Sequence, residues 1–176
     1  MWRSRIIATL VCVVSAVCSF VWQPLEAAAP MGKTAAKTVV DYYYLLPDEL
    51  FEVGRKERKL LLDPANRPVI DIAHGYLLAP GDGAQPNMEI ALFKKKNGDY
   101  VVAVCQKDLE TGDTVLNFFG NRNQRLVKLM GMIPVRSNSN FVYKLPRTGT
   151  TIEANNQKGK LVHSFAWTGE KFELLK

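Results

Sequence analysis

From about residue 66 to the C-terminus, short segments rich in β-branched and aromatic residues alternate with clusters of glycine, asparagine, aspartate and proline. The clearest pair of segments, 88–96 and 99–106, is joined by Asn97-Gly98, a dipeptide that suits the type I′ turn of a β-hairpin. Strand-like segments at this spacing predict an antiparallel β-meander of about seven to nine strands, folded as a sandwich or an open barrel.

A two-residue loop would also fix the register of this hairpin. It would place Ile90 opposite Cys105, Leu92 opposite Ala103 and Phe93 opposite Val102. Both faces of the hairpin are apolar near its middle, so the two strands should lie centrally in the sheet with both faces buried. Cys105 lies among valines and an alanine, which predicts a small buried hydrophobic residue rather than a reactive nucleophile.

One helical segment is expected before the strands. Pro47 followed by two acidic residues is typical of a helix start, and Pro64 disfavours helical geometry at the residue before it. We therefore expect a helix over about 47–62, either continuous or broken near Gly54. The expected fold class is therefore α+β but mostly β. It consists of a single β-rich domain over residues 41–176 with a short N-terminal helical segment.

The first thirty residues have the three-part pattern of a secretory signal peptide. Two arginines precede an uncharged apolar stretch at 6–22, and Ala27-Ala28-Ala29 offers small residues to a signal peptidase. We place the signal peptide at 1–28 and a linker at 29–40, with cleavage after any of the three alanines. The alternative is a retained anchor, because the apolar stretch is only slightly shorter than a spanning helix.

Both interpretations of the leader place the rest of the chain outside the cytoplasm, because the basic residues stay on the cytoplasmic side. We therefore expect a periplasmic or secreted protein, anchored to the membrane if the leader is kept. After cleavage no intrinsic membrane span is expected.

Composition narrows the possible functions. The formal net charge of the 176 residues is +6, an excess too weak and too dispersed to predict nucleic-acid binding. Only Cys105 of the three cysteines follows the leader, so no internal disulfide is expected after export. The two histidines, His74 and His163, are far apart in sequence and predict no metal site. We expect no cofactor, and the sequence indicates no catalytic residues.

Two groups of candidate binding residues lie on expected loops. Asp82 stands between two glycines in the turn-rich loop 80–87, where the backbone is free to approach a ligand. Lys94, Lys95 and Lys96 lie at a hairpin tip and could steer an anionic partner, although such charges usually serve solubility and protect sheet edges.

Tyr42 and Tyr44 form a third candidate site within a run of three tyrosines. In a strand, consecutive side chains alternate between faces, so at least one tyrosine would be exposed if one face is core. Exposed tyrosines suit contact with protein or carbohydrate. The alternative is that an adjacent helix buries both faces.

These observations favour an exported, non-catalytic domain that binds a protein, a glycan or a cell-envelope component. The alternatives are an exported hydrolase and an accessory subunit of an envelope assembly. The sequence does not indicate an oligomeric state. A binding domain should show an exposed apolar or aromatic patch, and an accessory subunit an unpaired sheet edge. An enzyme should bring at least two residues of one group into hydrogen-bond contact in a pocket: Asp71, His74, Asp82, Cys105 and His163.

Overall fold

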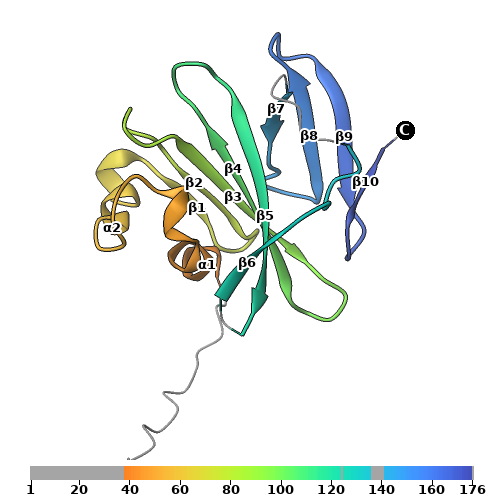
Figure 1. Cartoon of the computed structure of the whole chain (residues 1–176), viewed down its shortest axis with the longest axis horizontal. Coiled ribbons are helices and arrows are strands. Elements are labelled where there is room, and N and C mark those ends of the chain that lie inside the picture. The colour runs from red at the N-terminus through yellow and green to blue at the C-terminus, as the bar shows by residue number, and fades with distance from the viewer. Residues whose placement is uncertain (1–37, 124, 136–140, 176) are drawn as a thin grey trace, which may run out of the picture. The chain divides into compact units, whose positions relative to one another are not determined.

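Two antiparallel β-sheets, one of six strands and one of four, make up most of the protein (Figure 1). The computed structural model describes residues 38–123, 125–135 and 141–175. The expected signal peptide lies outside this range, as does the expected linker apart from its last three residues. The chain divides into two units, residues 1–34 and 35–176, and both sheets belong to the second.

The six-stranded sheet is a meander in which each strand pairs with the next along the chain. Its strands are β1 (Val69–Asp71), β2 (Tyr76–Ala79), β3 (Asn87–Lys94), β4 (Tyr100–Lys107), β5 (Thr114–Arg122) and β6 (Arg125–Leu129). The second sheet has the order β10-β9-β8-β7. It contains β7 (Phe141–Lys144), β8 (Thr151–Asn156), β9 (Leu161–Trp167) and β10 (Phe172–Leu174). The described residues thus form ten strands, against the seven to nine expected, and the two outermost, β1 and β10, have three residues each.

Both faces of the six-stranded sheet are covered. One face shares a buried cluster with the second sheet, including Phe93 and Val101 from the first sheet and Phe165 from the second. The other face packs against the helical N-terminal segment, where Ile90 and Val102 are buried. The expectation that β3 and β4 form a central element buried on both faces is confirmed.

The register expected for the β3–β4 hairpin is wrong by one residue. The observed pairs are Ile90 with Val104, Leu92 with Val102, Phe93 with Val101 and Lys94 with Tyr100. The Gly98 N–H donates to the Lys95 carbonyl at 3.0 Å, and the Lys95 N–H donates to the Asp99 carbonyl at 2.7 Å. Gly98 has a φ of 91°, whereas Asn97 does not adopt a positive φ. The turn is therefore a three-residue loop with a bulge at Gly98, because a type I′ turn needs positive φ at both central residues.

The N-terminal segment is helical in short pieces: α1 (Val39–Leu45), η1 (Asp48–Leu50), α2 (Arg58–Leu61) and η2 (Pro64–Asn66). The expectation of a strand at the three tyrosines is wrong, because they lie in α1. Thr38 begins α1 with a capping box, in which its side chain accepts from the Asp41 N–H and its own N–H donates to the Asp41 carboxylate. Of the two forms expected for 47–62, the continuous helix is wrong and the broken one is observed, since only the two ends of that range are helical. Within the described residues, no helix has the length and apolar character needed to span a membrane.

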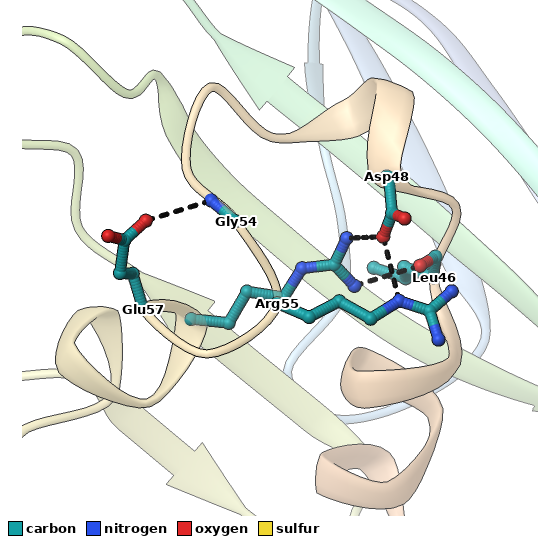
Figure 2. Close-up of polar contacts among 6 residues, drawn as sticks. Leu46, Asp48, Gly54, Arg55 and Glu57 are labelled. Atoms are coloured by element: carbon teal, nitrogen blue, oxygen red, sulfur yellow. Dashed lines mark hydrogen bonds and ion pairs between the residues drawn. The ribbon is translucent and has the colours of Figure 1, made fainter.

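A buried arginine holds the irregular part of this segment in place. Arg58 is fully buried, and its guanidinium donates to the Leu46 carbonyl at 2.9 Å and to the Asp48 carboxylate. The exposed Arg55 donates to the same carboxylate oxygen at 2.9 Å. In Figure 2, Leu46 and Asp48 face the segment that carries Arg55. Within that segment, Glu57 accepts from the Gly54 N–H. Side-chain hydrogen bonds, in place of the backbone hydrogen bonds of a helix, thus hold the loop between η1 and α2.

Candidate functional site

An apolar groove of about 540 Å³ opens where β6 separates from β5. The pairing between these strands ends at Phe118 and Leu129. Beyond that pair the chain runs toward β10 (Figure 1), where the Phe172 N–H donates to the Met132 carbonyl at 3.0 Å. Among the described strands, the first four residues of β5, 114–117, therefore pair through their backbone with β4 alone. β7 lies beside the start of this stretch, where the Thr114 hydroxyl donates to the Phe141 carbonyl at 3.0 Å and accepts from the Tyr143 N–H at 2.9 Å.

The lining of the groove shows that it follows the edge of β5. Val115 and Asn117 lie on one face of the strand, and Leu116 and Phe118 lie on the other, yet all four line the groove. A cavity over a single face would be lined by alternate residues only. The opposite wall is formed by the chain that leaves β6.

Large aliphatic side chains in the groove are exposed to solvent. Val115 is 57% exposed and Met130 is 81% exposed, and Ile133 and Val135 are half-buried beside them. Lys128 is the charged residue of this lining. Asn117 is only 8% exposed, and its side-chain amide makes no hydrogen bond within the part of the chain that the structure describes. The amide atoms keep contact with solvent, so they are available to a partner that enters the groove.

A polar cluster occupies a different corner of the protein, at the turn between β1 and β2. The Asp71 carboxylate accepts from His74 Nδ1 at 2.9 Å, from the His74 backbone N–H at 3.2 Å and from Arg147 Nε at 2.9 Å. These donors lower the pKa of Asp71 to about 2, with Arg147 as the largest cause and His74 next. Because Arg147 comes from the β7–β8 loop, this cluster links the two sheets.

A second carboxylate holds the same loop. Glu89 on β3 accepts from the Leu145 N–H at 3.1 Å. Burial raises the pKa of Glu89, and the Leu145 N–H and the nearby Lys144 and Lys107 oppose this rise. Burial together with the Glu89 charge also raises the pKa of Cys105 to about 12, which keeps this thiol protonated and unreactive at neutral pH.

An enzyme was expected to bring at least two of five named residues into hydrogen-bond contact in a pocket, and the structure meets this condition in part. Asp71 and His74 do come into hydrogen-bond contact. The cavity of about 360 Å³ beside this corner is lined by residues 144–151 and Glu153, so it includes Arg147 but neither Asp71 nor His74. The other group members lie apart from the pair. Cys105 is buried between the sheets, and His163 packs between Phe141 and Phe165.

Asp82 is engaged by its own loop between β2 and β3. Its carboxylate accepts from the Ala84 N–H at 3.1 Å and from the Gln85 N–H at 2.8 Å. This side chain therefore stabilises the turn, with the pattern typical of aspartate in tight loops.

The two candidate tyrosines lie on different sides of α1. Tyr42 is buried and packs edge-on against Tyr100, whereas Tyr44 is partly exposed and packs against Tyr43. The hydroxyl of Tyr43 donates to the Arg58 carbonyl at 3.1 Å. The helix thus gives the three tyrosines three different surroundings, and Tyr42 offers little surface to a partner.

The lysines at the β3–β4 turn lie beside the β9–β10 turn. Lys96 pairs with Glu170 at 3.2 Å, and its backbone N–H donates to the Gly169 carbonyl at 3.3 Å. Trp167 Nε1 donates to the Lys94 carbonyl at 2.7 Å. Lys94 is exposed and Lys95 is half-buried. The three lysines therefore lie at the end of β3 opposite to the Asp82 loop. Tyr42, by contrast, lies close to them, because it packs on Tyr100, the residue that pairs with Lys94.

The groove residues were not among the candidates expected from the sequence. A usable signal was the apolar run from Met130 to Val135, which belongs to no strand. An apolar run outside regular structure must be buried by something else or remain exposed. Comparison with protein family models, curated proteins and solved structures finds no match to this chain.

Proposed function

We propose that this protein is an exported, non-catalytic domain that binds a partner protein of the cell envelope through the groove beside β5. The observation that carries the proposal is the exposed apolar lining, above all Val115 and Met130. Each such side chain contributes about 1.5–3 kcal/mol when a partner buries it completely. Export is supported by the pattern of residues 1–28.

The chemistry of the groove favours a protein over a glycan. Sugar rings are commonly held by flat aromatic faces and by several polar side chains, whereas the exposed residues here are aliphatic. Methionine adapts its shape to varied apolar partners, and Met130 and Met132 both line the groove. An unpaired sheet edge is also what an accessory subunit would show, so both non-catalytic hypotheses lead to the same surface.

The test is retention of an identified envelope protein by immobilised wild-type protein and by two groove variants, Val115→Asp and Met130→Asp. Both positions are exposed, so the variants should fold normally, as circular dichroism would check. Val162→Asp is the matched control, because Val162 is 42% exposed on β9 and does not line the groove. We expect both groove variants to lose the partner and the control to keep it. Equal retention by all four proteins would contradict the proposal.

An exported hydrolase is the second candidate, favoured by the contact between Asp71 and His74. A carboxylate on Nδ1 orients the imidazole and leaves Nε2 available as a general base, and the His74 side chain is 54% exposed. Hydrolysis of simple ester, phosphate or glycoside substrates that His74→Gln abolishes would support this function. Absence of any such activity in the wild-type protein would exclude it for these substrates.

A further inference from the structure

We propose that the partner binds as an added β-strand along residues 114–117 of β5, as an extended apolar segment that carries a carboxylate next to Lys128. This inference rests on the proposed function and states how the groove is filled. It commits to one occupant, a strand of a partner protein.

The first argument is the open backbone of β5. In an antiparallel sheet, alternate residues point their N–H and C=O groups away from a given neighbour. Half of these groups in residues 114–117 therefore point away from β4, and no described strand pairs with them; residues 115–117 line the groove on this side. Unpaired strand edges with apolar flanks are templates for pairing with another chain.

The second argument is the shape of the lining. Consecutive residues from both faces of β5 line the groove, so an occupant lies in the plane of the sheet, along the strand edge. A strand does this, because its own side chains alternate between the two faces. On one face it would cover Val115, and its backbone or a polar side chain would meet the amide of Asn117, which makes no hydrogen bond within the described residues.

The third argument is charge. Lys128 is exposed, lines the groove, and has no ion-pair or hydrogen-bond partner within the described ranges. The rest of the groove lining is uncharged. A strand whose acidic residue lies next to Lys128 would therefore complement the groove, and this single charge would set its direction along β5.

The first measurement uses the free protein. Hydrogen exchange followed by NMR should show fast exchange for the outward-pointing amides of residues 114–117 and slow exchange for the amides of β4. If all four amides of this stretch exchange as slowly as β4, the edge is already covered and the inference is wrong.

The second measurement uses a synthetic peptide as the probe, six alternating valines and threonines with a glutamate at one end. Binding should shift the NMR signals of Val115, Leu116 and Asn117. N-methylation of one alternate set of peptide nitrogens should weaken binding about tenfold, and methylation of the other set should have little effect, because only one set bonds the edge. Lys128→Met should remove the preference for glutamate over glutamine.

The outcomes separate this inference from the proposed function. Equal effects of both methylated sets, or no peptide binding at all, would overturn strand addition. The groove variants would still lose the envelope partner if the proposed function is correct. A concentration-dependent dimer that Val115→Asp disrupts would identify a second copy as the occupant and would also overturn this inference.

Discussion

The guanidinium carbon of Arg58 lies 3.8 Å from the centre of the Phe51 ring, inside the protein. This stacked cation is fully buried, and burial lowers the pKa of Arg58 while Asp48 opposes that change. Arginine nevertheless stays charged in proteins. The N-terminal segment is therefore organised around a buried charge as well as by apolar packing.

Arg58→Ala should destabilise the fold by about 3 kcal/mol, because it removes the ring contact, leaves the Leu46 carbonyl without its donor and opens a cavity. Arg55→Ala is the matched control. Arg55 bonds the same carboxylate from an exposed position, and exposed pairs contribute less than about 1 kcal/mol. Urea unfolding of both variants measures the difference. Equal losses in the two variants would show that Arg58 acts only as a surface charge.

Asp71→Asn should lower stability at pH 7, because Arg147 and His74 both donate to this carboxylate. The folded pKa of Asp71 is about 2, below its unfolded value of about 3.9. The stabilisation is therefore fully present above pH 4 and is lost as the pH falls from about 4 to about 2. Urea midpoints of wild type and variant should converge over that range. Asp99→Asn, in the exposed β3–β4 turn, serves as the control, and its midpoint should stay close to that of the wild type at every pH.

Glu89→Gln should have the opposite pH dependence. The folded pKa of Glu89 is raised by burial, so the wild-type protein loses stability as the pH rises through that folded pKa. Glutamine stays neutral and can still accept from the Leu145 N–H. The variant should therefore gain stability relative to wild type as the pH rises above the ordinary pKa of glutamate, as thermal unfolding would measure. Glu110→Gln, in the exposed β4–β5 loop, should show no such gain, and a parallel gain there would argue against burial as the cause.

The mass of the exported protein should correspond to a chain that begins at Ala28, Ala29 or Pro30. Cleavage there follows from the three small residues after the apolar stretch. Mass spectrometry of the protein recovered from the periplasm or the medium measures the N-terminus directly. An intact chain found soluble in the cytosol would contradict export, and an intact chain in the membrane fraction would support the retained anchor.

The strands were more predictable than the N-terminal segment. Alternating polarity and turn residues gave the meander, but Asn97-Gly98 suggested a shorter turn than the one formed, because Gly98 alone takes the left-handed conformation. Thr38 and Asp41 form a capping box that the sequence already contains. Its four-residue pattern identifies α1 and excludes a strand at the tyrosines that follow.

The groove could not be derived from local sequence signals. Exposure of Met130 depends on β6 leaving β5 after Leu129, which is set by contacts with β10 some forty residues later in the chain. The cluster at Asp71 shows the same limit. His74 is three residues away, but Arg147 is 76 residues away and arrives only through the packing of the second sheet.

Cys105 is the one cysteine that follows the predicted leader, and it is enclosed between the two sheets with its sulfur 3.6 Å from the Tyr143 carbonyl oxygen. A reagent such as iodoacetamide can alkylate it only when the sheets separate. The rate of alkylation in native buffer would therefore report how often the molecule opens spontaneously, without an attached label and inside intact cells.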